Sequence, residues 1–190
     1  MKEIRIGLVG YGFMGKTHTY GYKTLPLYYS KLPFRVKLVG VCSGHLENAL
    51  AAKEDMGYEF ATDCADDIFN SKDIDAVNIC TPNNLHKDMI LKALKSGKHI
   101  YCDKPLATSV EESEEVLDCL GSSDVITQVA FHNRFFPATM RAKQIMDEGR
   151  IGRILSFRVA YLHSGSVDPN RPIGWKQDKK IGGGGVLFDM

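Results

Sequence analysis

A glycine-rich turn near the start of the chain constrains the fold more than any other feature. The apolar, β-branched residues 4–9 predict a strand, and a helical pattern begins at about Phe13. Gly10, Gly12 and Gly15 lie between them and fit the pattern G-x-G-x-x-G. In a dinucleotide-binding fold these glycines make the turn, admit a pyrophosphate to the backbone and let the helix pack on its strand. The alternative is a structural turn in an α/β protein.

The N–H groups at the start of such a helix face the phosphates of a bound dinucleotide. We therefore predict cofactor contacts from the whole loop: Gly10, Tyr11, Gly12, Phe13, Met14 and Gly15.

The rest of the chain alternates between strand-like and helical patterns, which indicates a parallel sheet with helices on both faces. Further strands are expected at residues 36–42, 58–60, 76–80, 99–102 and 125–131. Helices are expected at residues 13–25, 46–56, 65–70, 81–96, 111–120 and 138–148. Pro26 and Pro33 bracket an aromatic connection that is either a surface loop or a partner contact. Residues 154–162 alternate like a strand that opens a second sheet, and residues 164–185 are expected to form a loop.

Composition limits the class of protein. The formal net charge is +1, and no basic cluster with interleaved aromatic residues occurs, so nucleic-acid binding is not expected. No secretory signal and no apolar run of membrane-spanning length is present, which predicts a cytoplasmic protein without a membrane partner. The five cysteines form no C-x-x-C pair, so we expect neither a disulfide framework nor a metal site.

The chain length of 190 residues predicts one full domain and part of a second. We place a dinucleotide-binding domain at residues 1–132. Residues 133–190 are interpreted as a linker helix and the start of a truncated substrate and oligomerisation domain, because the chain stops on a fresh apolar run.

Several ordered motifs carry a family resemblance. D-A-V-N-I-C-T-P-N-N-L-H spans residues 75–86, and C-D-K-P-L spans residues 102–106. R-F-F-P-A at residues 134–138, E-G-R-I-G at 148–152 and G-G-G-G-V-L-F-D at 182–189 follow. Together they resemble the Gfo/Idh/MocA family, which includes glucose–fructose oxidoreductase and inositol dehydrogenase, over essentially the whole chain.

The resemblance implies a Rossmann-type doubly wound parallel sheet, followed by the start of an α/β domain with an open, mostly antiparallel sheet. Family members transfer a hydride between NAD or NADP and a hydroxyl or carbonyl of a sugar, cyclitol or related small polyhydroxylated molecule. They are usually homo-oligomers. The alternative is a ligand sensor or transcriptional regulator that binds the dinucleotide on the same scaffold without turnover. Retention of Lys104 and Asp189 favours the enzyme.

The resemblance assigns the chemistry to Lys104, which would give or take the proton of the reacting oxygen. Asp189 matches a carboxylate that orients the substrate or pairs with the catalytic histidine and lysine, and the family's catalytic histidine would fall beyond Met190. Without the resemblance, Lys104 reads as a surface lysine and Asp189 as a helix cap. The implied cofactor contacts are Thr81, Pro82, Asn83, His86, Asp103 (where the family usually has Glu) and Lys104; Trp175 with Lys176, and His132 or Arg134, match the family more weakly.

The end of the second predicted strand determines the choice of dinucleotide. A carboxylate there would bind the ribose 2′-hydroxyl of NAD and repel the 2′-phosphate of NADP. The chain has no acid at this place; Ser43, Gly44 and His45 follow the strand and are able to accept a phosphate, although no Arg accompanies them. The sequence therefore favours NADP over NAD.

Overall fold

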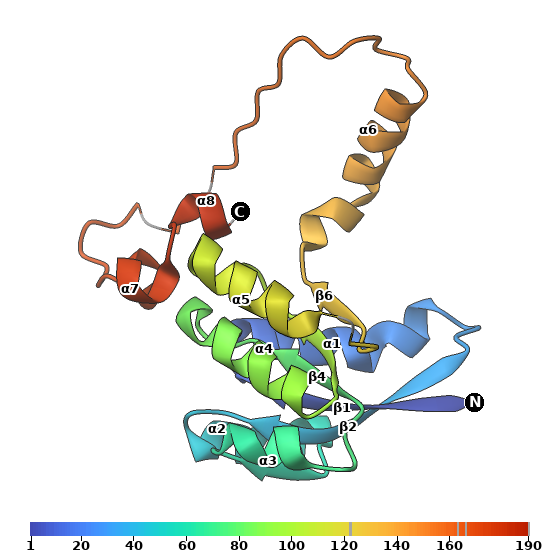
Figure 1. Cartoon of the computed structure of the whole chain (residues 1–190), viewed down its shortest axis with the longest axis vertical. Coiled ribbons are helices and arrows are strands. Elements are labelled where there is room, and N and C mark those ends of the chain that lie inside the picture. Colours follow the sequence, from blue (N-terminus) through green and yellow to red (C-terminus); the bar gives the residue numbers. More distant parts are fainter. Residues whose placement is uncertain (122, 163, 166, 190) are drawn as a thin grey trace. The chain divides into compact units, whose positions relative to one another are not determined.

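The computed structural model describes residues 1–121, 123–162, 164–165 and 167–189. The chain divides into two compact units, one of Met1–Ala130 with the chain from Trp175 onward, and the other of Phe131–Gly174. Figure 1 shows the elements of both units. Among the described residues, no helix combines the length and the apolarity that crossing a membrane requires.

A six-stranded parallel sheet forms the centre of the first unit. The strands lie in the order β3-β2-β1-β4-β5-β6, which is the order of a doubly wound dinucleotide-binding fold. This order confirms the predicted fold class. The chain builds the sheet outward from β1 to β3 on one side and from β4 to β6 on the other, so the strand order reverses between β1 and β4. The strands are β1 (Lys2–Val9), β2 (Phe34–Cys42), β3 (Phe60–Thr62), β4 (Ala76–Ile79), β5 (His99–Cys102) and β6 (Thr127–Val129).

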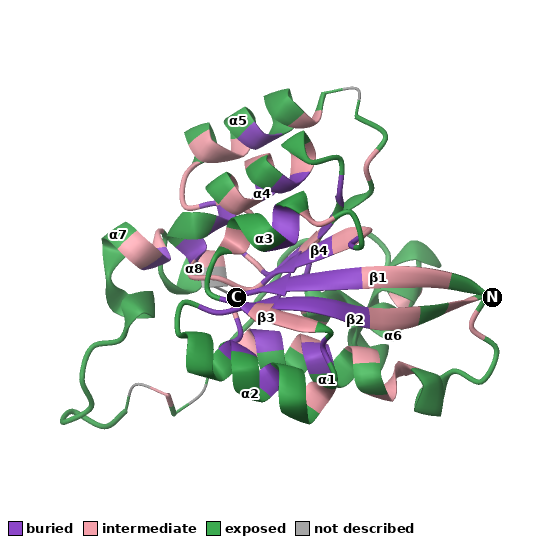
Figure 2. Cartoon of the chain, turned by 90° about the horizontal axis from the view of Figure 1, so that it is seen from below, coloured by how far each residue is buried: buried purple, intermediate pink, exposed green. Residues whose placement is uncertain are grey.

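Helices cover both faces of this sheet (Figure 2). One face carries α1 (Phe13–Tyr28) and α2 (Leu46–Met56), and the other carries α3 (Ala65–Asn70), α4 (His86–Lys95) and α5 (Val110–Leu120). A single-turn helix, η1 (Asn83–Leu85), leads into α4. The first turn of α5 is capped by Ser109, whose Oγ accepts a hydrogen bond of 3.2 Å from the N–H of Glu112.

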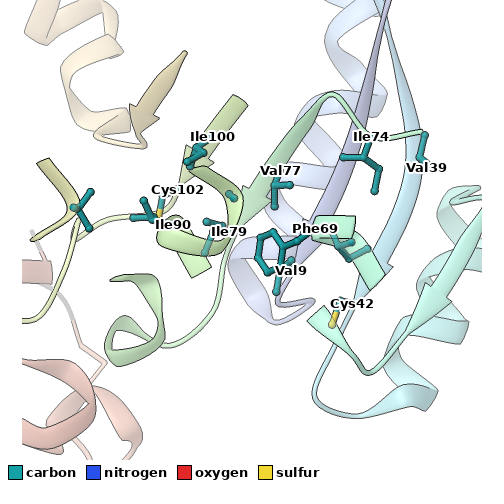
Figure 3. Close-up of a cluster of buried hydrophobic side chains, with 13 residues drawn as sticks. Val9, Val39, Cys42, Phe69, Ile74, Val77, Ile79, Ile90, Ile100 and Cys102 are labelled. Carbon is teal, nitrogen blue, oxygen red and sulfur yellow. The ribbon is translucent and has the colours of Figure 1, made fainter. Parts of the chain in front are cut away.

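The core lies on both faces of the sheet because neighbouring residues of a strand point to opposite sides. Leu8 packs against the side of α1 and α2, whereas Val9 packs against the side of α3 to α5. Both are almost completely buried. Figure 3 shows the cluster that contains Val9; Val77 and Ile79 of β4 and Ile90 of α4 belong to it. Burial on two faces explains why the second halves of β1 and β2 form continuous apolar runs in the sequence.

The second unit contains η2 (His132–Phe135) and α6 (Pro137–Asp147). The strand predicted at residues 154–162 is absent from the structure, which describes all of these residues without regular structure. Leu155, Phe157 and Val159 are 87%, 82% and 80% exposed. A strand needs backbone partners on a neighbouring strand, and the described residues of this unit contain none. The prediction of a second sheet is therefore not fulfilled by this segment.

Other differences concern the ends of elements and the predicted loop at 164–185. α1 continues through Pro26 to Tyr28, so part of the predicted aromatic connection is helical. The predicted loop instead contains η3 (Trp175–Gln177) and α7 (Lys179–Gly182), and α8 (Val186–Asp189) follows. The Asp178 side chain caps α7, accepting from the N–H of Lys180. Ser166, also within the predicted loop, lies outside the described residues.

An ion pair joins β1 to the start of β4. Arg5 Nη2 lies 2.7 Å from Asp75 Oδ1, and the Arg5 Nε donates to Asp75 Oδ2 at 3.1 Å. The backbone N–H of Arg5 also donates to this carboxylate, at 2.8 Å. The side-chain bonds from Arg5 lower the pKa of Asp75 below its usual value.

We expect Asp75→Asn to lower the thermal midpoint by a few degrees at pH 7, because the neutral amide loses the charged contacts. A lowered pKa in the folded state stabilises the fold above the unfolded value of about 3.9, and this contribution disappears as the pH falls through the folded pKa. The difference from wild type should therefore vanish near pH 2 in thermal scans. Asp73→Asn is the matched control, because its side chain is 79% exposed at 3.4 Å from Arg5. An equal loss in both variants would contradict the assignment.

Candidate active site

A pocket of about 470 Å³ lies in the first unit, where β1, β2, β4 and β5 end. In open parallel sheets, ligands bind at the carboxyl ends of the strands and at the point where the strand order reverses. The pocket meets both conditions. Its lining residues are Gly10, Tyr11, Gly12, Phe13, Met14, Ser43, Gly44, His45, Asn48, Cys80, Thr81, Pro82, Asn83, Asp103, Lys104, Trp175 and Lys176.

The glycine loop forms one wall of this pocket. Gly10 has φ 98°, a left-handed conformation, and a Cβ on it would stand 2.5 Å from the carbonyl oxygen of Cys80. A Cβ on Gly15 would stand 2.1 Å from the carbonyl oxygen of Gly10, so α1 can pack this closely only without a side chain there. Gly15 is buried and does not line the pocket.

The N-terminus of α1 suits an anion. Gly12 precedes the helix, is exposed, and offers no side chain to cap it. The first turn of α1 carries no acidic residue. The first N–H groups of a helix have no partner within the helix, and their partial positive charge favours an anion. Phe13 and Met14 of this turn line the pocket, so a diphosphate bound there would meet these groups.

Two buried oxygen atoms in the pocket wall have no hydrogen-bond partner in the part of the chain that the structure describes. Thr81 Oγ1 and Asp103 Oδ1 have no hydrogen bond among the described residues. Asp103 is 7% exposed and follows directly after β5. Leaving a buried polar atom unsatisfied costs roughly 1–3 kcal/mol, so a ligand that bonds to both atoms would be favoured. These residues therefore fit a bound ligand that is rich in hydroxyl or amide groups.

Lys104 is half-buried and lines the same pocket, one residue after Asp103. The Lys104–Pro105 peptide bond is cis. Cys80 is the neighbouring pocket residue at the end of β4, and burial together with the nearby Asp103 raises the pKa of its thiol. The thiol is therefore neutral at physiological pH, and Lys104 is the better candidate for moving a proton in this part of the pocket.

His86 lies behind the pocket rather than in it. The ring is fully buried, with Nδ1 2.7 Å from the carbonyl oxygen of Pro105 and Nε2 2.9 Å from that of Thr81. These two carbonyl groups belong to the loops that carry Lys104 and Thr81. His86 is predicted as a cofactor contact but does not line the pocket, because it begins α4 and its buried ring lies between these two loops.

The remaining predicted residues fall in different places. Trp175 and Lys176 line the pocket, and the Lys176 Nζ lies 5.7 Å from the centre of the Trp175 ring. His132 belongs to the second unit, in η2, where its ring lies 5.9 Å from that of Phe136. Asp189 lies in α8, and its side chain is outside the described part of the structure.

Two pocket residues were missed from the sequence. Cys80 reads as one more buried residue of an apolar run, although its position directly after β4 is a signal for the pocket edge. Asn48 lies in the first turn of α2, where its N–H donates to the carbonyl of His45 at 3.0 Å. The helical pattern after residues 43–45 was sufficient to place Asn48 beside them. Among the described residues, no group of three metal-ligating side chains gathers.

Known proteins resemble this chain along its whole length. A sequence model of an oxidoreductase family with an NAD-binding Rossmann fold matches residues 4–131, and a model of the Gfo/Idh/MocA C-terminal domain matches residues 139–190. Levoglucosan dehydrogenase of Pseudarthrobacter phenanthrenivorans is 40% identical over 190 residues, which is 100% of this chain and 49% of the relative. Inositol 2-dehydrogenase of Rhizobium meliloti is 31% identical over 187 residues, covering 98% and 51%.

Solved structures agree with these sequence matches. A levoglucosan dehydrogenase in complex with NADH and levoglucosan superposes with a TM-score of 0.94 at 39% identity, covering 100% of this chain and 51% of that chain. An oxidoreductase domain protein from Kribbella flavida superposes with a TM-score of 0.93 at 31% identity and the same coverage. The chain thus spans about half the length of the relatives that it matches.

We expect His86→Ala to lower the free energy of unfolding by about 2–4 kcal/mol, because the buried ring, whose N–H donates to the carbonyl group of either Pro105 or Thr81, is removed and a cavity forms. Urea unfolding followed by circular dichroism measures this loss. The control is His45→Ala, an exposed histidine, which should stay within about 0.5 kcal/mol of wild type. Equal free energies of unfolding for the two variants would show that the His86 contacts do not stabilise the fold.

Proposed function

The chain belongs to the Gfo/Idh/MocA family of oxidoreductases, and from this membership and the pocket we propose that it is the cofactor-binding part of a nicotinamide-dependent dehydrogenase. The proposed substrate is a sugar, a cyclitol or a related small polyhydroxylated molecule. One observation carries the proposal: the glycine loop and Lys104 line the same pocket at the reversal of the strand order. The names of the relatives, a levoglucosan and an inositol dehydrogenase, support the substrate class.

The residues of the chain divide the work of this reaction. The start of α1 holds the pyrophosphate through its free N–H groups. Thr81 Oγ1 and Asp103 Oδ1, which have no partner among the described residues, bind hydroxyl or amide groups of the cofactor. When bound, the nicotinamide supplies the hydride acceptor or donor. Lys104 takes the proton of the substrate hydroxyl during oxidation and returns it during reduction.

Further parts of the proposal concern the whole protein. Asp189 and residues of the substrate domain orient the substrate, and the protein forms a homo-oligomer in the cytoplasm. The five free thiols fit a reducing compartment. We place the change from dinucleotide-binding to substrate domain at residue 132, and the two family matches, which end at 131 and begin at 139, support this position.

We expect Lys104→Ala to lower kcat at least a hundredfold in the full-length protein while dinucleotide binding survives, because only the proton transfer is lost. Initial rates with levoglucosan, inositols and aldoses, followed by NADH or NADPH absorbance, measure kcat; calorimetry measures binding. Lys95→Ala, an exposed lysine at the end of α4, is the control and should be fully active. Turnover that survives Lys104→Ala would contradict the role of this lysine. Wild-type binding without turnover on any of these substrates would favour the ligand sensor.

The choice between NAD and NADP is proposed to lie at the end of β2. Ser43, Gly44, His45 and Asn48 line this part of the pocket without an acidic residue. Ser43 is buried, and its Oγ accepts a bond of 3.4 Å from the N–H of His45. A neutral site does not repel a 2′-phosphate, and this supports NADP. In contrast, the solved levoglucosan dehydrogenase holds NADH, which supports NAD for that relative.

We therefore expect wild type to bind NADPH more tightly than NADH, and Ser43→Asp to reverse this order by about tenfold or more, because the new carboxylate repels the 2′-phosphate. Titration calorimetry with both cofactors gives the ratio of Kd values. The matched control is Ser43→Asn, which has nearly the same shape without the charge. A wild-type preference for NADH would overturn the prediction of NADP.

A further inference from the structure

The segment of residues 175–184 packs within the first unit and supplies one wall of the dinucleotide pocket through its first two residues. Within the first unit, Trp175 and Lys176 of η3 line the pocket, and α7 follows directly. In the sequence these residues stand far from the loops that form the other walls. The structure therefore has to hold this wall in place by contacts between distant residues.

The first of these contacts is a buried hydrogen bond. The Asn83 Nδ2 donates to the carbonyl oxygen of Gly182 at 3.0 Å across 99 residues of sequence. Asn83 is 4% exposed and Gly182 is buried. A buried amide donor and a carbonyl at the end of α7 satisfy one another here, so separating them would leave both without a partner. Asn83 also lines the pocket, which connects this bond directly to the cofactor wall.

The second contact is a close approach of backbones. Gly183 has φ 77°, and a Cβ on it would stand 3.1 Å from Thr108 Cβ and 3.2 Å from the Thr108 carbonyl oxygen. Thr108 cannot yield easily, since its N–H and its Oγ1 both donate to Glu112 Oε2, at 2.8 and 2.7 Å. Gly183 therefore rests against a fixed point at the start of α5.

Gly182 connects the contact between Gly183 and Thr108 to the pocket wall, because it packs against Lys176. A Cβ on Gly182 would stand 2.6 Å from the carbonyl oxygen of Lys176, so α7 and η3 pack without a side chain between them. A shift of the Gly182–Gly183 backbone would consequently move Lys176 and, next to it, Trp175.

We propose that Asn83, Gly182, Gly183 and Thr108 form a clasp that holds Trp175 and Lys176 against the bound dinucleotide and sets how tightly it is held. The proposal rests on the proposed function, because it assumes that the pocket binds a dinucleotide. Gly183 and Thr108 do not line the pocket and act as positioning residues through Trp175 and Lys176.

Trp175 is the single tryptophan of these 190 residues, so in the 190-residue chain its emission reports directly on the clasp. Excited tryptophan transfers energy to a nearby reduced nicotinamide, so wild type titrated with NADH or NADPH should lose Trp175 emission as the cofactor binds. Gly183→Ala introduces the Cβ that meets Thr108. We expect it to raise the Kd roughly three- to tenfold and to reduce the energy transfer at saturation.

Gly185→Ala is the matched control. Gly185 also has a positive φ, 62°, but a Cβ on it meets no atom within 4 Å among the described residues. Both variants place Ala at a positive φ, and only Gly183→Ala adds the contact with Thr108; the ψ of −120° at Gly183 adds backbone strain to that contact. The control should reproduce the wild-type Kd and energy transfer.

A second variant keeps the test decisive if Gly183→Ala fails to fold. Asn83→Asp has nearly the same shape as the wild-type residue, but it loses the donor and places a carboxylate against the Gly182 carbonyl. It should raise the Kd and also reduce the energy transfer at saturation. The second readout separates the clasp from a lost direct contact of Asn83, because it depends on where Trp175 lies. Wild type that binds no dinucleotide would refute the proposed function. Wild-type binding with Kd and transfer unchanged in the variants would refute the clasp alone.

Discussion

The close approach of three strand ends at Gly10 is the constraint on which the site depends. Its N–H donates to the carbonyl of Cys42 at the end of β2, at 2.9 Å, and a Cβ on it would collide with the carbonyl of Cys80 after β4. Only a glycine accepts both the left-handed φ and this contact. Because β1, β2 and β4 converge there, the phosphate-binding start of α1 lies beside the loops that carry Ser43 and Thr81. Any side chain at this position would separate the pocket walls.

The central part of the sheet could be predicted from the sequence because β4 and the second halves of β1 and β2 are buried on both faces. Leu8 and Val9 belong to different clusters, so β1 carries an apolar residue at every position there and its pattern is easy to recognise. The strand predicted at residues 154–162 shows the limit of the same reading. Alternation of apolar and polar residues shows that a segment has one apolar face. Whether that face is buried depends on another part of the chain that packs against it, and the local pattern does not show this. In the described residues, Phe157 and Val159 remain exposed.

The site residues that come directly after a strand could be predicted from the sequence. Ser43, Thr81 and Lys104 each follow a strand, and the carboxyl-end rule brings them together without knowledge of the packing. Residues on helices were harder to assign. His86 shares a motif with Thr81, but the direction of its ring is decided by the start of α4 and by a carbonyl at Pro105. Such orientations depend on tertiary contacts between loops that the local pattern does not encode.

The segment after Trp175 illustrates a related limit, because its role in the pocket comes from backbone contacts alone. A run of four glycines reads as a flexible loop, yet Gly182 and Gly183 are the points where the chain comes closest to Lys176 and Thr108. Glycine acts here as it does at Gly10, by removing a side chain that would hold two backbones apart. Residues that match the C-terminal family model thus complete the compact unit formed by the N-terminal one. The boundary between sequence families and the boundary between packed units need not coincide, since the first follows the order of the chain and the second follows its contacts.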